Sequence, residues 1–267
     1  MDEKEYLEIV KKTPKPTNIT WNENGKLCIL YIECRDLEIV PYNLYNICNV
    51  YGGTDASLVI AFSSVNEKTI MDVTCDWKDV NYIKISNDES SIKMYNLLFT
   101  RSGFWELFCK HEYVLINQWD SYIFRQIPEK FFKYDYIGAP CGHVYVIRNN
   151  RVLNICGKGC KCGKCIRKVG EFKLEPSEKV YNMFNGGFSL RKVSAMIYLC
   201  NRKTFQGEQE DIYFCLSDIN LPEVEESKEF SVDNIPYNGI PVGCHKVWCY
   251  NTREYIENLF KNNNLIN

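Results

Sequence analysis

Two positions in this chain of 267 residues carry acidic side chains that are candidates for metal binding or proton transfer. Asp120 follows a predicted strand at 112–118, and ligands of open α/β sheets bind outside the carboxyl ends of the strands. A single carboxylate there suits a hard divalent cation that keeps several waters and bridges to phosphates. Glu210 and Asp211 begin a predicted helix, where one carboxylate can accept a proton from a hydroxyl. The alternatives are a loop cap for Asp120 and simple complementation of the helix dipole for the pair.

Other candidate residues belong to short irregular segments. Asn185, Gly186 and Gly187 place two glycines beside an amide, which lets the backbone approach a bound ligand closely, although an ordinary turn is the alternative. His245 lies in the segment GCHK and is a candidate ligand, whereas His111 follows a predicted helix end and is interpreted as structural. The chain has no GxSxG, Walker or GxGxxG motif, which disfavours a serine hydrolase, a P-loop and a dinucleotide fold.

A cysteine cluster interrupts the second half of the chain, at Cys156, Cys160, Cys162 and Cys165. Four thiolates with intervening glycines can wrap one zinc ion tetrahedrally, and such an ion would be structural because no coordination position stays open. The spacing is tighter than that of paired CxxC knuckles, and the basic residues around it can lower the pKa values of the thiols. Free thiols in a surface insertion and a disulfide pair are the alternatives.

The elements that must position these residues follow an α/β pattern. Short apolar runs are typical of buried strands, and a helix is predicted to start at Pro41. The alternation of strands and helices favours a largely parallel sheet. The predicted strands of the first half are 27–35, 57–64, 81–86 and 112–118. The second half is less regular, with short strands at 135–140 and 143–150, a loop entering a strand over 183–192, a helix over 208–219 and a strand at EFSVDN.

Composition and charge narrow the class of protein. A net charge of −2 leaves no electrostatic footprint for nucleic acid. The longest apolar runs are far shorter than the ~20 residues of a membrane span, and the N-terminus lacks the apolar region of a signal peptide. We therefore expect a cytoplasmic protein whose 14 cysteines are thiols or metal ligands. Residues 1–25 are predicted to be a flexible leader, and residues 26–267 a single domain.

Several blocks of the sequence, in order over about residues 27–250, resemble the domain-of-unknown-function family 5672: ILYIECR, FWELF, VLINQWDSYIF, YDYIGAP, NGGFSLR, QEDIYF, EFSVD and GCHKVW. That family is described as glycosyltransferase-like and has members in giant viruses. The resemblance implies a GT-A-like (Rossmann-like) α/β fold, with a mixed, mostly parallel sheet flanked by helices. It also implies an enzyme that moves a sugar from a UDP- or GDP-sugar to a hydroxyl of a glycan, protein or lipid. The host cytoplasm or the virion would be its location.

The resemblance also implies roles for single residues. Asp120, in the block Gln118-Trp119-Asp120, takes the place of a motif that is often Asp-X-Asp, and with His245 it would hold Mn²⁺ or Mg²⁺. Asp211, with Glu210, takes the place of the catalytic base of an inverting enzyme, although retention stays open. The residues implied to line the pocket for donor and acceptor are Glu33, Arg35, Gln118, Asn185, Gly186 and Gly187. The cysteine cluster looks like an insertion that the family does not require.

Three alternatives stay open beside this interpretation. A degenerate enzyme would bind a nucleotide sugar without transferring it, and the presence of Asp120, Asp211 and His245 argues against that loss. An interaction module would use a zinc-stabilised cysteine loop to bind anions or a partner protein. A nucleotidyltransferase would need a glycine-rich basic loop after the first strand, where this chain has RDLEIVPYN instead.

Overall fold

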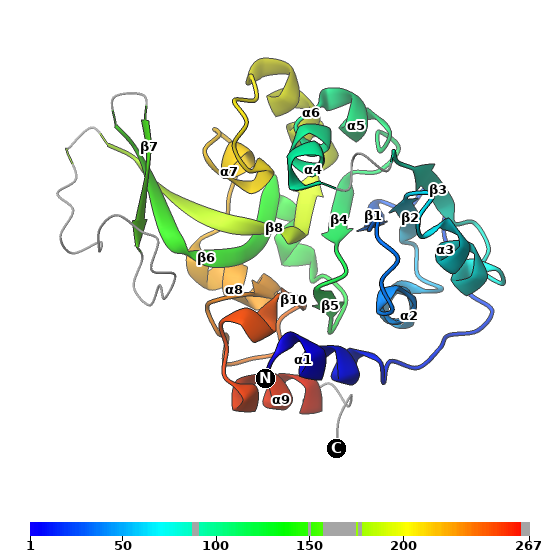
Figure 1. Cartoon of the computed structure of the whole chain (residues 1–267). Coiled ribbons are helices and arrows are strands. Elements are labelled where there is room, and N and C mark those ends of the chain that lie inside the picture. The colour runs from blue at the N-terminus through cyan, green and yellow to red at the C-terminus, as the bar shows by residue number, and fades with distance from the viewer. Residues whose placement is uncertain (87–90, 149–150, 157–174, 176–177, 263–267) are drawn as a thin grey trace.

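The computed structural model describes residues 1–86, 91–148, 151–156, 175 and 178–262. Within them a seven-stranded sheet has the order β3-β2-β1-β4-β8-β6-β7, and a smaller sheet has the order β5-β10-β9 (Figure 1). The strands of the large sheet are β1 (Leu27–Ile32), β2 (Ser57–Phe62), β3 (Asn81–Lys84), β4 (Tyr113–Asn117), β6 (Tyr136–Arg148), β7 (Arg151–Cys156) and β8 (Val180–Lys192). Those of the small sheet are β5 (Ser121–Ile123), β9 (Ser231–Val232) and β10 (Gly243–His245).

The helices lie on both faces of the large sheet and, in the case of the first and the last helix, beside the small sheet. They are α1 (Glu3–Val10), α2 (Val40–Tyr51), α3 (Glu67–Thr74), α4 (Ile92–Phe99), α5 (Ser102–Glu106), α6 (Val193–Arg202), α7 (Glu210–Cys215), α8 (Val224–Phe230) and α9 (Arg253–Lys261), with 3₁₀ turns at Glu129–Lys133 and Val247–Cys249. In the described part of the chain, no helix is both long and apolar enough to cross a bilayer.

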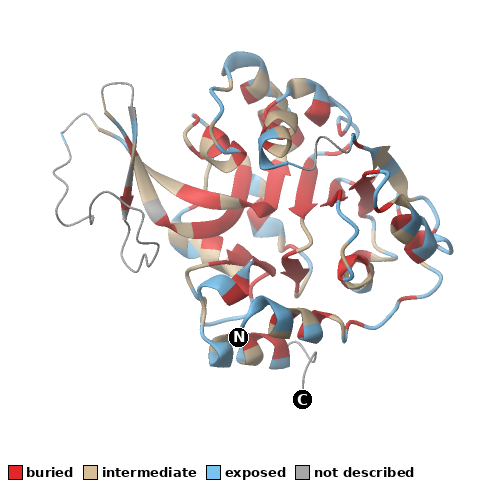
Figure 2. Cartoon of the chain, viewed as in Figure 1, coloured by how far each residue is buried: buried red, intermediate tan, exposed pale blue. Residues whose placement is uncertain are grey.

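The large sheet lies between two layers of helices, because successive side chains of a strand point to opposite faces of the sheet. In β1, Ile29 and Tyr31 face the core cluster that includes the buried side chains of α2 and α3. Cys28 and Leu30 face the opposite cluster, which includes buried side chains of α4 to α7. Every residue of β1, β2 and β4 is buried, as Figure 2 shows by colour. The predicted strands of the first half and the α/β class are therefore confirmed.

The sheet is mixed, as predicted: β3, β2, β1, β4 and β6 run in one direction and β8 and β7 in the other, while its adjacent pairs divide evenly. The pairs β1–β2, β2–β3 and β1–β4 are parallel. The pairs β4–β8, β6–β8 and β6–β7 are antiparallel. The reason lies in the connections: crossover helices join the parallel strands of the first half, whereas a short hairpin joins β6 to β7 and forces them to run in opposite directions.

Local differences from the sequence prediction concentrate in the second half. The two short strands expected at 135–140 and 143–150 form one strand, β6, whose pairing with β8 shifts around Pro140. The segment around Asn185 that was expected to be a loop lies inside β8. The strand expected at EFSVDN is instead the end of α8 followed by the two residues of β9. The strand residues in these segments pair with a strand that is distant in the sequence, and this pairing is not visible in the local pattern.

The first residues of the chain, expected to be a flexible leader, contain the packed helix α1. Its N-terminus carries a capping box in which Asp2 and Glu5 bond reciprocally to each other's backbone N–H groups. The ring of Tyr6 lies 4.3 Å from that of Trp248 and 5.7 Å from that of Phe260, measured between centroids. Helices α1 and α9 consequently lie side by side, and this segment forms part of the core instead of a free leader (Figure 1).

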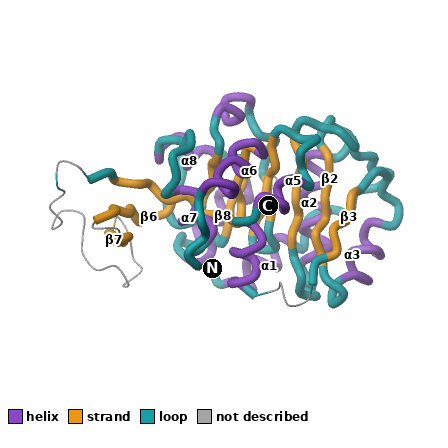
Figure 3. Tube along the Cα trace, turned by 90° about the horizontal axis from the view of Figure 1, so that it is seen from above, coloured by secondary structure: helices purple, strands orange, loops and turns teal. Residues whose placement is uncertain are grey.

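Strands β6 and β7 extend away from the rest of the sheet, as both Figure 1 and Figure 3 show. The cysteine cluster follows β7 in the sequence. Cys160, Cys162 and Cys165 lie outside the described residues, and of Cys156 only the backbone, at the end of β7, is described. The structural zinc ion at this cluster stays a prediction.

Candidate active site

A cleft of about 350 Å³ lies where β1 and β4 end, and the residues that follow both strands line it. Its size is in the range of small-molecule sites. Strand β8, the first turn of α7, the end of β10 and one face of α4 complete the walls. All ten of the predicted site residues outside the cysteine cluster line this one cleft: Glu33, Arg35, Gln118, Asp120, Asn185, Gly186, Gly187, Glu210, Asp211 and His245.

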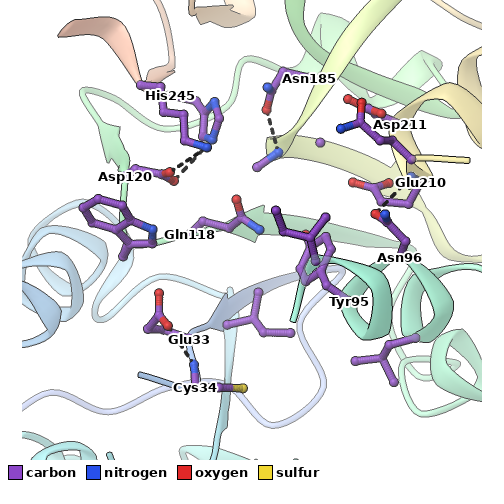
Figure 4. A pocket seen from close by; sticks show the side chains of 18 of the residues that line it. Glu33, Cys34, Tyr95, Asn96, Gln118, Asp120, Asn185, Glu210, Asp211 and His245 are labelled. Carbon is purple, nitrogen blue, oxygen red and sulfur yellow. Dashed lines mark hydrogen bonds and ion pairs between the residues drawn. The ribbon is translucent and has the colours of Figure 1, made fainter. Parts of the chain in front are cut away.

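The small sheet brings His245 to Asp120. In the antiparallel pair β10–β5, His245 is opposite Ser121, the residue after Asp120. The backbone N–H of Lys246 donates to the carbonyl oxygen of Asp120 over 2.9 Å and continues this contact beyond the strands. As a result, Nε2 of His245 lies 3.2 Å from Oδ1 of Asp120 (Figure 4). On the other side of the ring, Nδ1 lies 3.4 Å from Oδ2 of Asp233.

The charges of this corner stabilise one another. Burial alone would raise the pKa of Asp120, but His245 and Lys246 outweigh it and hold that pKa below its ordinary value. Burial alone would lower the pKa of His245, but Asp120 and Asp233 raise it to about 9. This corner therefore favours the ionised form of Asp120 and, when no metal ion is bound, a proton on His245, which a metal ion would have to displace.

The same corner fits a divalent cation. Oδ1 of Asp120 and Nε2 of His245 are buried and face each other over 3.2 Å, and neither has a further hydrogen-bond partner among the described residues. Two donors separated by 3.2 Å can both lie about 2.1 Å from one shared ion. No group of three or more His, Cys, Asp or Glu side chains in the described residues is arranged to hold a metal ion. Water and substrate would have to supply the other ligands, as is usual for Mg²⁺.

Gly187 keeps this corner open. A Cβ atom at that position would lie 2.4 Å from Nε2 of His245 and 2.5 Å from Oε1 of Gln118. The amide oxygen of Asn185 accepts the N–H of Gly187 over 2.7 Å, which holds the backbone of β8 in place. The two glycines thus allow a close approach to the backbone of β8, as predicted for a ligand. In this structure the groups that approach it are side chains of the protein itself.

On the opposite side of the cleft, Glu210 forms an ion pair with Arg191. Nη1 of Arg191 lies 2.8 Å from Oε2 of Glu210, and Nη2 donates to Oε1 over 3.0 Å. Both side chains are buried, and the guanidinium lies 4.8 Å from the ring centroid of Tyr136 and 5.2 Å from that of Phe99. A Cβ atom on Gly186 would lie 1.9 Å from Oε1 of Glu210. Glu210 is engaged in this pair, so Asp211 is the better candidate for a base.

Asp211 has a very different environment from Asp120, although both line the same cleft (Figure 4). Burial and the neighbouring charge of Glu210 raise its pKa to about 7, and Arg191 offsets only part of that rise. The side chain accepts the backbone N–H of Ile212 over 2.8 Å, which orients the carboxyl group. A carboxylate that takes up protons near neutral pH is suited to general acid–base chemistry.

A third wall is formed by the residues that follow β1. Oε1 of Glu33 accepts the backbone N–H groups of Cys34 and Arg35 over 2.9 and 2.8 Å, and Oε2 lies 2.7 Å from Nη2 of Arg35. The guanidinium of Arg35 lies 5.3 Å from the ring centroid of Trp119. Asn66 anchors this loop by donating from Nδ2 to the carbonyl oxygen of Glu33 over 2.7 Å. The wall therefore offers a rigid surface with a flat aromatic ring.

Three charged residues of the site received no individual role from the sequence. Arg191, Asp233 and Lys246 each belong to a block that carried the family resemblance. An arginine inside the apolar strand that ends at Lys192 is one signal of a buried partner, because a buried charge needs an opposite charge. Nothing comparable distinguishes Asp233 or Lys246 in the sequence, since only the packing of the small sheet brings them to His245.

Comparison with known proteins identifies one family. The model of a family described as "Protein of unknown function (DUF5672)" matches residues 79–245 of this chain. The match is the family named from the sequence resemblance, and its range includes Asp120, Asp211 and His245, whereas Glu33 and Arg35 precede it. No curated protein matches the chain.

Proposed function

This chain belongs to the DUF5672 family, and we propose that it is a glycosyltransferase that moves a sugar from a nucleotide-sugar donor to an acceptor hydroxyl. The observation that carries the proposal is a single cleft with two unlike acidic corners. Asp120 is ionised beside His245 at one corner, and at the other the pKa of Asp211 is about 7. The first corner suits a cation that binds a diphosphate, and the second suits removal of a proton from a hydroxyl.

The architecture supports a GT-A-like fold. The parallel strands β3, β2, β1 and β4 end at one edge of the sheet, where open α/β sheets bind nucleotides. Antiparallel β8 then contributes Asn185 and the two glycines to the opposite wall. A donor that reaches from the wall around Arg35 and Trp119 to the Asp211 corner would be contacted by both halves of the sheet.

In the proposed reaction, Asp120 and His245 hold Mn²⁺ or Mg²⁺. When bound, this ion offsets the negative charge that develops on the departing nucleoside diphosphate. The Glu33–Arg35 pair and Trp119, which line the end of β1 and of β4, contact the nucleotide. Arg191 keeps Glu210 in place, and Glu210 in turn positions the first turn of α7.

Asp211 performs the proton transfer. Its carboxylate takes the proton of the acceptor hydroxyl while that oxygen forms a bond to the anomeric carbon of the sugar. The bond between the anomeric carbon and the phosphate oxygen breaks in the same step, and its electron pair leaves with the nucleoside diphosphate. A single displacement of this kind inverts the anomeric configuration.

The first test is a thermal-shift panel of nucleoside diphosphates and of UDP-, GDP-, TDP- and CMP-sugars, with and without Mn²⁺. At a ligand concentration 100-fold above Kd we expect about 2.7 kcal/mol of stabilisation, a rise of roughly 5–10 °C in Tm. Asp120→Asn should lose the part of this rise that depends on Mn²⁺, whereas Asp218→Asn, an exposed acid, should keep it. No shift with any nucleotide would contradict the proposal.

Turnover separates an active enzyme from the degenerate alternative. The donor that binds should be consumed when candidate acceptors are added, with release of its nucleoside diphosphate. Binding without any turnover, on glycan, protein and lipid acceptors alike, would favour a protein that only binds nucleotide sugars. The cytoplasmic or virion location and the giant-virus source stay predictions.

A further inference from the structure

The described cations in the cleft and directly behind it are all close to carboxylates. Arg35 and Arg191 lie 2.7 and 2.8 Å from Glu33 and Glu210, respectively. His245 lies 3.2 Å from Asp120 and 3.4 Å from Asp233, and Nζ of Lys246 lies 3.3 Å from Asp120. Within the part of the chain that the structure describes, a diphosphate in this cleft therefore meets no cation that is free of a carboxylate neighbour. It needs either an added cation or the release of one of these four.

Lys246 is the cation that can be released most readily. Its side chain is 46% exposed, while that of its partner Asp120 is only 1% exposed. Arg35 is bound to Glu33 through Nε and Nη2, Arg191 is buried, and His245 is buried between two carboxylates. The ammonium of Lys246 contacts Asp120 at a single long distance, and four methylene groups give it room to swing.

The backbone holds Lys246 beside Asp120 even if the ammonium moves away. The N–H of Lys246 donates to the carbonyl oxygen of Asp120 over 2.9 Å. The residue has a φ of 46°, in the left-handed region that non-glycine residues rarely adopt. Such a conformation persists only when the surrounding structure imposes it, and it often marks a functional site.

We propose that Lys246 is a tethered cation that exchanges with the divalent ion at Asp120. Without the ion, the ammonium holds the buried carboxylate; with the ion, it turns to the phosphates of the donor. This inference rests on the proposed function, because it assumes both a cation and a diphosphate.

Charge explains both positions. Asp120 is buried and, when no metal is present, Lys246 adds a second positive charge to that of His245 beside the carboxylate. A divalent cation on the same carboxylate repels the ammonium, and the incoming phosphates attract it. The exchange would let one lysine help to neutralise the buried carboxylate before the donor binds and contribute to donor binding afterwards.

The exchange predicts effects of opposite sign in one variant. In Lys246→Met, Mn²⁺ alone should bind the full-length chain about fivefold more tightly, because the competing ammonium is gone. In the presence of saturating Mn²⁺, UDP and GDP, whichever binds the wild-type chain, should bind about tenfold more weakly. Titration of free Mn²⁺ by electron paramagnetic resonance measures the first effect, and calorimetry measures the second.

Matched variants keep the test decisive. Lys261→Met removes an exposed lysine of α9 and should change neither affinity. Lys246→Arg keeps the charge and should retain most of the nucleotide affinity, which would assign a loss in Lys246→Met to the missing charge, while Mn²⁺ binding by Lys246→Met shows that this variant is folded. Asp120→Asn should lose Mn²⁺ binding.

The outcomes separate this inference from the proposed function. If Mn²⁺ affinity is unchanged or weaker in Lys246→Met while Asp120→Asn loses it, the exchange is wrong and the metal site stands. If nucleotide affinity is unchanged in Lys246→Met, the phosphate role is wrong. If the wild-type chain binds nucleotide but no Mn²⁺, both the exchange and the metal part of the proposed function are overturned.

Discussion

Asp120 and Asp211 face the same cleft, but their environments shift their pKa values in opposite directions. Asp120 has two cationic neighbours, His245 and Lys246, and its pKa is lowered despite burial. Asp211 is next to Glu210, whose charge adds to the effect of burial and raises the pKa of Asp211 to about 7. Arg191 forms its ion pair with Glu210 and offsets the raised pKa of Asp211 only in part.

The difference shows that the neighbours, rather than the residue type, decide what each aspartate can do. A permanently ionised carboxylate can hold a cation but is a poor proton acceptor. A carboxylate that titrates near neutral pH can remove a proton from a hydroxyl. Groups whose environments separate their pKa values in this way commonly divide the tasks of a reaction between them.

The largest expected effect is on turnover, at the Asp211 corner. Asp211→Asn should lower kcat about 10²–10⁴-fold, because the amide cannot accept the proton. Donor affinity should stay near that of the wild type, since the Asp120 corner is intact. Steady-state kinetics and donor calorimetry check the two quantities, with Asp218→Asn as the exposed control. Undiminished kcat would exclude Asp211 as the base.

The next effect is on stability, through the buried pair that supports Asp211. Arg191→Met should lower the free energy of unfolding by about 3–5 kcal/mol, because Glu210 then has a buried and unpaired charge. The double variant Arg191→Met, Glu210→Met should recover a large part of that loss. Urea denaturation measures both, and equal stabilities of the single and double variants would show that the pair is not coupled.

A smaller effect is expected at the Asp120 corner. Asp233→Asn should weaken Mn²⁺ binding about 10–100-fold, because Asp233 orients the ring of His245 through Nδ1. Electron paramagnetic resonance of free Mn²⁺ gives this affinity without any turnover. Asp233→Asn should leave the pH dependence of turnover unchanged, and a shift in that dependence would mean that the two corners are not separate.

The dependence of stability on pH sharpens the comparison further. The folded chain binds the proton of Asp211 more tightly than the unfolded chain, so between the ordinary pKa of 3.8 and about 7 this group removes stability as pH rises. The loss is at most about 1.4 kcal/mol per pH unit. Asp211→Asn should therefore be more stable than the wild type at pH 8, relative to their difference at pH 4.

The pH profile of turnover tests Asp211 through activity instead of stability. Turnover should rise with pH through about 7 as Asp211 becomes a base. Glu210→Gln should move this midpoint to lower pH, because the charge of Glu210 is one cause of the raised pKa. If the midpoint is the same in Glu210→Gln as in the wild type, a group other than Asp211 sets it.

Sequence reasoning succeeded where local pattern and tertiary structure agree. The buried strands β1, β2 and β4 are short apolar runs, and α2 begins with Pro41 near its N-terminus. It failed where pairing with a distant segment determines the backbone conformation. The prediction split β6 into two strands, and it expected the Asn185 segment to be a loop. Strand formation there depends on the partner strand, which a local pattern does not contain.

The α/β class and the family could be recognised from the sequence, and the resemblance to that family indicated the residues that line the cleft. How those residues divide their tasks depends on contacts that exist only in the folded chain. The pairing of β10 with β5 brings His245 and Lys246 to Asp120, and the buried Arg191 removes Glu210 from the candidate bases. These contacts join residues far apart in the chain, and a pKa is set by neighbours in space rather than in sequence.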